Sequence, residues 1–68
     1  MNKFTPIEIL HLSNRTLNAL INNDILLIEQ LISKTERELL ALKGIGVAVL
    51  QEIKEKLVKN ELKLASNM

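Results

Sequence analysis

The 68-residue sequence predicts an all-α domain, a compact bundle of about five short helices. Apolar residues recur at helical spacing along most of the chain, helix-capping residues precede several of these stretches, and no segment carries a strand signal. A chain of this length has room for one domain only. We therefore expect residues 1–68 to form a single unit, with loose ends at 1–5 and 65–68.

Two helices are predicted in the first third of the sequence. A short turn begins at Thr5-Pro6-Ile7-Glu8, because threonine is a capping residue, proline suits the first helical position and glutamate suits the third. Ser13 is a good N-cap for the next helix, expected at about residues 14–22. Asn22-Asn23-Asp24 then predicts a turn, since these residues tolerate left-handed backbone. The inward stripe of the helix is predicted to be Leu17, Leu20 and Ile21.

The rest of the sequence predicts further helices. Residues 25–32 are mostly apolar, which predicts a short buried helix around 27–32. Thr35-Glu36-Arg37-Glu38 is a capping box that opens the next helix. The last helix is expected from about 47 to 59, with Asn60 as a left-handed stop and a partly loose tail from residue 61 onward. The predicted core is aliphatic and includes Leu17, Leu20, Ile28, Leu31, Leu39, Leu50, Ile53 and Leu57.

Residues 39–53, LLALKGIGVAVLQEI, predict a helix-hairpin-helix. Leu39 and Leu42 close one helix, and Lys43-Gly44-Ile45-Gly46 makes a sharp turn into the next. Glycine lets the backbone adopt φ > 0 and approach a ligand closely. The start of the second helix presents N–H groups and a partial positive charge, which suit a phosphate. The alternative is a plain helical corner in which the glycines only save space.

The helix after Ser13 carries a polar face. Arg15, Asn18 and Asn22 fall at i, i+3 and i+7, opposite the predicted apolar stripe. Arginine near a helix start opposes the helix dipole, so helix stability does not explain its presence. Arginine can reach into a minor groove or bind phosphate, and asparagine can donate to a phosphate or a base edge. The alternative is a solvated polar face, which every small helix needs.

Composition limits the classes of function. Nine basic and eight acidic residues leave a net charge of +1, so any nucleic-acid affinity must come from a local patch and should be weak. The single histidine, His11, and the lack of cysteine provide no metal site. No catalytic triad and no nucleotide-binding glycine loop is present, so we expect neither enzyme activity nor a cofactor. Without cysteine or an apolar run of about 18 residues, the protein is expected to be cytoplasmic, with no membrane partner.

Two segments together resemble the C-terminal domain of the bacterial RNA polymerase α subunit. PIEILHLSNRTLNAL is similar to that family's opening pattern, PIxxLxLSxRxxNxL, and SKTERELLALKGIGVAVLQEIKEKL is similar to its closing pattern, xxTExELLxxxxxGxxxLxEIxxxL. The resemblance implies a fold of five helices that binds the minor groove of A·T-rich promoter DNA and contacts transcription factors or other polymerase subunits. It also implies that Arg15 and Asn18 make the main DNA contacts and that Gly46 presents a backbone N–H to phosphate.

The sequence departs from the family pattern just after that glycine. The family has a lysine and a serine there that face DNA, and the matching positions are Ala48 and Val49, with Val47 before them. The loss of one phosphate contact lowers the slope of log DNA affinity against log salt concentration by about one unit. Lys43, which precedes Gly44, is expected to compensate in part for the missing phosphate contact.

Two interpretations follow, for a chain that is either free-standing or excised from a longer protein. In the first, the chain is a transcription module that binds A·T-rich DNA weakly through Arg15, Asn18, Lys43, Gly44 and Gly46. In the second, it is a protein-interaction domain on the same fold. Its exposed apolar patch, which binds a partner or a second copy of the chain, is then formed by Val47, Ala48 and Val49.

Overall fold

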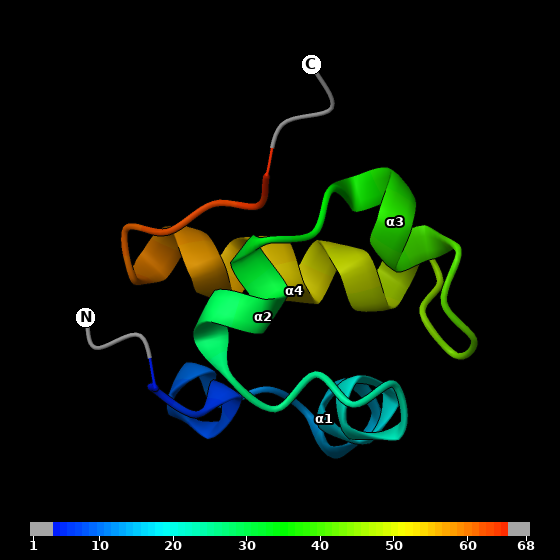
Figure 1. Cartoon of the computed structure of the whole chain (residues 1–68), viewed down its shortest axis with the longest axis horizontal. Coiled ribbons are helices and arrows are strands. Elements are labelled where there is room, and N and C mark those ends of the chain that lie inside the picture. Colours follow the sequence, from blue (N-terminus) through cyan, green and yellow to red (C-terminus); the bar gives the residue numbers. More distant parts are fainter. Residues whose placement is uncertain (1–3, 66–68) are drawn as a thin grey trace.

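The structure is a computed structural model that describes residues 4–65. It contains a 3₁₀ helix, η1 (Ile7–Leu10), and four α-helices: α1 (Asn14–Asn22), α2 (Ile28–Ile32), α3 (Glu36–Leu40) and α4 (Val47–Lys59) (Figure 1). The predicted all-α class is confirmed, and the bounds of α1 and α4 agree with the prediction. Of the loose ends predicted at 1–5 and 65–68, residues 1–3 and 66–68 lie outside the described residues.

Helix α4 is the centre of the fold. It crosses the middle of the molecule in Figure 1, and both α1 and α3 pack against it. Within residues 4–65 the buried core is aliphatic apart from Thr16, while the single aromatic residue of the sequence, Phe4, is 65% exposed. The buried hydrophobic residues are Ile7, Leu10, Ala19, Leu20, Ile25, Ile28, Leu31, Leu39, Ile45, Val49, Leu50, Ile53 and Leu57.

Helix α1 is rotated by about one position relative to the prediction. Ile21, predicted to point inward, is 38% exposed, and Leu17 is only half-buried. Thr16 and Ala19 are buried instead. The rotation has a tertiary cause, because the Thr16 hydroxyl is bonded to α4 and the small Ala19 side chain lets the turn between α3 and α4 approach α1 closely.

Side chains cap two helices where the sequence predicts. The Ser13 hydroxyl accepts a hydrogen bond from the Thr16 N–H (3.4 Å). The Thr35 hydroxyl accepts from the Glu38 N–H (3.1 Å), and the Glu38 carboxylate accepts from the Thr35 N–H (2.9 Å). These bonds satisfy N–H groups that have no partner within their helix. The start of η1 differs from the prediction: Pro6 has an extended ψ of 151° and is therefore the N-cap, not the first helical residue.

The end of α4 differs from the prediction by one residue. Asn60 has a φ of −106°, and it is Glu61 that is left-handed, with a φ of 59°. The N–H groups of Glu61 and Leu62 donate to carbonyls of the last helical turn (3.0 and 2.8 Å), and the Asn60 side chain donates to the Lys56 carbonyl (2.9 Å). These bonds close the helix without glycine. Asp24, with a φ of 61°, is the second residue after α1, just as Glu61 is the second residue after α4.

Backbone hydrogen bonds anchor both ends of the described residues. The Thr5 carbonyl accepts a bond from the first N–H of α2 (2.7 Å), and the Ala65 N–H donates to the Lys34 carbonyl (3.0 Å). Leu62 and Leu64 pack against the core. Residues 62–65 are thus held beside α4, in a segment for which the sequence predicts a partly loose tail.

Candidate functional site

The turn between α3 and α4 contains two glycines in different conformations. Gly44 has a φ of 85°, which other residues adopt only at a cost, so the turn requires glycine there. Ile45 is only 4% exposed and fixes the turn to the core. Gly46, the N-cap of α4, has extended backbone (φ −101°, ψ −171°), and apart from its sequence neighbours no atom lies within 4 Å of an added Cβ. The fold therefore does not require glycine at position 46, and the space beside it is open.

A carboxylate that the sequence analysis missed joins α4 to the start of α1. Glu52 accepts hydrogen bonds from the Ser13 N–H (2.6 Å), the Ser13 hydroxyl (2.8 Å) and the Thr16 hydroxyl (2.5 Å). The Thr16 hydroxyl does most to lower the pKa of Glu52; the Ser13 N–H follows, burial opposes the effect, and the Ser13 hydroxyl and Lys56 add to it. One sequence signal was available: Thr16 occupies the position that is glutamate in a capping box, which leaves the Ser13 N–H without that local acceptor.

A second set of contacts joins the other end of α1 to the turn. The Asn23 side-chain amide donates to the carbonyls of Ala19 (2.8 Å) and Lys43 (3.0 Å). A Cβ built on Gly44 would lie 3.8 Å from the Cβ of Ala19, so the turn and α1 are in close contact. Helix α1 is therefore fixed to α4 at one end and to the turn between α3 and α4 at the other.

The polar residues predicted to bind DNA lie on α1 and on the turn. Arg15 and Asn18 are exposed on α1, together with Asn22, and Lys43 is exposed in the turn. Arg15 lines a hollow of about 150 Å³ that also reaches the first turn of α4 at Ala48. Asn18 and Lys43 do not line this hollow. The structure thus brings together Arg15 and the start of α4, which are far apart in the sequence.

The predicted apolar patch is wrong at one position. Val47 is 75% exposed and Ala48 is also exposed, but Val49 is only 2% exposed. Val49 is four residues before Ile53, so both side chains lie on the face of α4 that packs into the core. The patch available to a partner at the start of α4 is therefore Val47 and Ala48.

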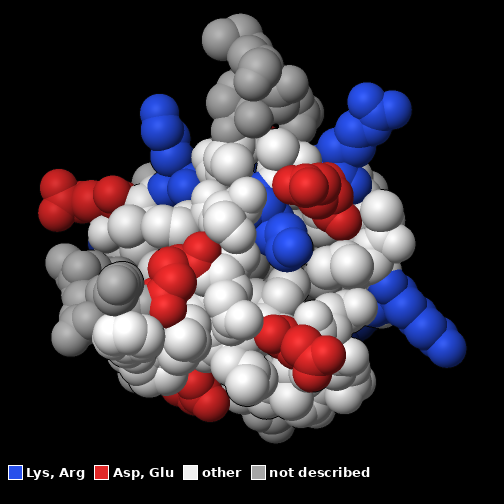
Figure 2. All heavy atoms as spheres, viewed as in Figure 1, with Lys and Arg blue, Asp and Glu red and all other residues white. Residues whose placement is uncertain are grey.

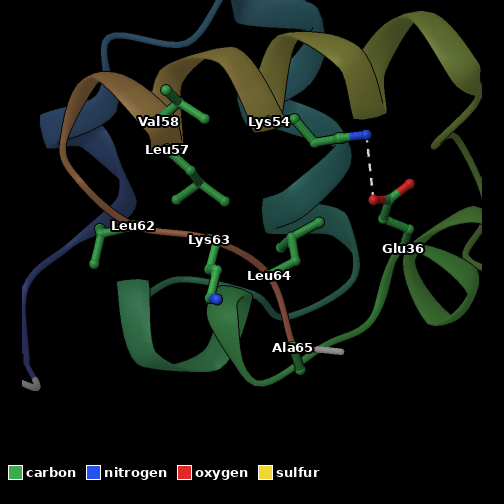
Figure 3. A pocket seen from close by; sticks show the side chains of 8 residues that line it. All are labelled: Glu36, Lys54, Leu57, Val58, Leu62, Lys63, Leu64 and Ala65. Atoms are coloured by element: carbon green, nitrogen blue, oxygen red, sulfur yellow. Dashed lines mark ion pairs between the residues drawn. The ribbon is translucent and has the colours of Figure 1, made fainter. Parts of the chain in front are cut away.

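A separate groove lies between α4 and the segment that follows it. Figure 3 shows Leu57, Leu62 and Leu64 around this groove of about 340 Å³, with the ion pair of Lys54 and Glu36 (3.2 Å) at one edge. The remaining lining residues are Val58, Lys63 and Ala65. None of these residues also lines the hollow beside Arg15.

On the face that Figure 2 shows, charge is distributed without one dominant sign. Figure 2 shows acidic and basic side chains interspersed on one face, as the net charge of +1 leads one to expect. No group of His, Asp or Glu among the described residues could hold a metal ion. None of the helices within residues 4–65 is long and apolar enough to cross a membrane.

A family model and individual relatives both relate this sequence to the same kind of protein. Residues 1–59 match the family model for the C-terminal domain of the bacterial RNA polymerase alpha chain. The sequence is 42% identical over 57 residues to the DNA-directed RNA polymerase subunit alpha of Herpetosiphon aurantiacus, and 40% identical over 67 residues to that of Desulforapulum autotrophicum. These alignments include 84% and 98% of this protein but only 17% and 20% of the two relatives. The chain thus spans about a fifth of the length of the curated relatives it matches.

The two glycines should respond differently to alanine. Gly44→Ala should lower the free energy of unfolding by about 1–2 kcal/mol, because alanine is strained at positive φ. Gly46→Ala should change it by no more than about 0.5 kcal/mol, because the backbone there is extended and the added methyl group meets open space. Urea denaturation followed by circular dichroism measures both values. Equal losses for the two variants would contradict the assigned roles.

The stability that Glu52 contributes should depend on pH. Its pKa is lower in the folded protein than the ordinary value of 4.5, so its contribution is complete above pH 4.5 and disappears as the pH falls through the folded-state pKa. The melting temperature of Glu52→Gln should therefore lie below that of the unchanged protein at pH 7, and the gap should narrow on acidification below pH 4.5. Melting curves of the two proteins at pH 7 and at a pH below 4.5 test this. A gap that stays constant would show that the ionised carboxylate contributes no stability.

Proposed function

The protein belongs to the family of C-terminal domains of the bacterial RNA polymerase alpha chain, and from this premise we propose that it is a DNA-binding module of transcription. The family match confirms the resemblance of the two sequence segments. The observation that most directly supports DNA binding is the hollow shared by Arg15 and the first turn of α4. A guanidinium there lies beside a helix start, whose N–H groups lack partners within the helix, and both suit an anionic backbone.

The proposed DNA-binding face consists of Arg15, Asn18, Lys43, Gly44 and Gly46. Arg15 enters a narrow A·T-rich minor groove, where the negative potential is enhanced, and Asn18 donates to a phosphate or a base edge. The open space beside Gly46 lets a phosphate approach the first N–H groups of α4. Lys43 adds a positive charge from the turn. Gly44 holds the turn in the conformation that this approach needs.

Glu52 also lines the hollow beside Arg15, so its negative charge bears on the proposed face. Its carboxylate accepts three hydrogen bonds from the start of α1, so its oxygens are engaged within the protein. The dipole of α1 offsets part of the remaining charge. The arrangement therefore reduces the repulsion that an acidic residue beside Arg15 would otherwise exert on a phosphate.

Binding is expected to be weak, and we propose that other contacts assist it. The net charge is only +1, and Ala48 and Val49 provide neither the cation nor the hydroxyl of the family pattern. The relatives are subunits of RNA polymerase. We therefore propose polymerase subunits or transcription factors as partners that hold the domain near its DNA.

A second candidate function is protein interaction through the start of α4. The 75% exposure of Val47, beside the exposed Ala48, favours this alternative, because an exposed apolar side chain next to a helix start suits a protein partner or a second copy better than a phosphate. The two candidates assign the same surface to different ligands.

Titration of a fluorescent duplex should detect the proposed binding. An A·T-rich duplex should bind more tightly than a G·C-rich one, and affinity should fall as salt rises from about 50 to about 200 mM. Arg15→Ala should reduce the affinity by at least about tenfold, because it removes a charged contact in the groove. Lys63→Ala is the matched control, since Lys63 is an exposed cation on the separate groove. Equal losses from both changes would indicate diffuse charge attraction instead of a defined face.

Restoring a lysine at position 48 separates the two candidate functions. Ala48 is exposed in the first turn of α4, so Ala48→Lys can add one phosphate contact and should steepen the slope of log affinity against log salt by about one unit. Val49 is left unchanged, because a serine there would bury a hydroxyl. If Ala48→Lys leaves both affinity and slope unchanged but abolishes self-association measured by sedimentation, the interaction function replaces DNA binding.

A further inference from the structure

Resting on the proposed DNA-binding function, we infer that Thr16 is a positioning residue whose buried hydroxyl, bonded to Glu52, sets the orientation in which α1 presents Arg15 beside the start of α4. Thr16 lines the same hollow as Arg15 but is only 1% exposed. Its effect on DNA would therefore pass through Arg15, its neighbour in the sequence.

The burial of Thr16 indicates a specific role for its hydroxyl. Among the buried residues of 4–65 it is the one with a polar side chain, and the others are aliphatic. A buried hydroxyl costs free energy unless it is hydrogen-bonded, whereas a valine of nearly the same shape would fill the site without that cost. The hydroxyl of Thr16 donates to Glu52 (2.5 Å) and accepts a longer hydrogen bond from the Ser13 hydroxyl (3.3 Å). Packing alone thus gives no reason for threonine here, but a directed bond to α4 does.

The first turn of α1 places Arg15 between two anchors. Ser13 and Thr16 both donate to Glu52, and Arg15 lies between them in the sequence. Two anchors in the first turn hold the rotation of that turn about the helix axis more firmly than Ser13 would by itself. Ser13 stands outside the helix as its N-cap, so Thr16 supplies the anchor within the helix. The direction in which Arg15 leaves α1 depends on this second anchor.

The remaining attachment of α1 does not duplicate this role. The Asn23 side chain bonds the carbonyl of Lys43 at the far end of the helix, and Ala19 touches the turn near Gly44. These contacts fix the end of α1 that is farther from Arg15. Loss of the Thr16 hydroxyl would leave that end in place, while the end that carries the arginine would be held to α4 only through Ser13.

Two variants separate the hydroxyl from the methyl group of this threonine. Thr16→Val keeps the shape and removes the hydroxyl, whereas Thr16→Ser keeps the hydroxyl and removes the methyl group. We expect Thr16→Val to weaken binding of the A·T-rich duplex by at least about fivefold. Thr16→Ser should stay within about twofold of the unchanged protein. The salt slope of Thr16→Val should not change, because no phosphate contact is removed.

A merely structural role gives a different pattern. Thr16→Ser leaves a small void in the core and so lowers the stability of the domain. If Thr16 affected DNA binding only through stability, the serine variant would also lose affinity. Affinities are therefore measured at a temperature at which circular dichroism shows every variant to be folded. Thr16→Ala provides a second hydroxyl-free variant in case valine prevents folding, with the same loss expected. In an Arg15→Ala background, Thr16→Val and Thr16→Ser should bind the duplex equally, because the positioning acts through the arginine.

The outcomes distinguish this inference from the function on which it rests. If the unchanged protein does not bind the duplex, the proposed function fails and the inference fails with it. If the unchanged protein binds and Thr16→Val binds equally well, only the positioning role is overturned. Equal losses in the valine and serine variants also overturn it, because the methyl group would then matter as much as the hydroxyl.

Discussion

The burial of one face of α4 is the interaction on which the rest of the structure depends. Ile53 and Leu57 are almost completely removed from solvent, and both α1 and α3 reach the core through contact with this helix. The one aromatic side chain of the protein, Phe4, lies mostly outside the core, so aliphatic residues alone must close around α4. Aliphatic burial is strong but non-directional. It holds the helices together without fixing how each one is rotated.

Local signals in the sequence predict much of the fold. The capping residues Ser13 and Thr35 mark the starts of α1 and α3, and the spacing of apolar residues indicates the extents of α1 and α4. Each of these signals involves neighbours within a helical turn. The rotation of α1 was not predictable in this way. It depends on the bond of Thr16 to another helix. Leu17 and Ile21 are as apolar as core residues, so their side chains gave no sign that they would not form the buried face. The end of α4 was missed by one residue, since the closing hydrogen bonds tolerate a left-handed residue other than asparagine or glycine.

The candidate site was predictable in its parts but not in its assembly. The sequence predicts that Arg15 is exposed on a polar helix face and that the turn contains a glycine at positive φ, and the structure agrees on both. The contact of the Arg15 side of α1 with the start of α4 is tertiary and has no local signature. Glu52 was missed because its hydrogen-bond partners belong to a distant helix. Val49 was assigned to the surface from its family position, whereas its own helical spacing places it in the core.

The bonds between Glu52 and Ser13 join residues 39 positions apart, which has a consequence for synthesis on the ribosome. The N-terminal half of the protein leaves the ribosome first, and helices as short as α1 are marginally stable in water by themselves. Until α4 has emerged, α1 lacks both its acceptor and the surface on which it packs. The domain can therefore complete folding only after translation has passed α4. A ribosome stalled in the turn between α3 and α4 would carry a nascent polypeptide in which the two halves of the proposed face have not yet met.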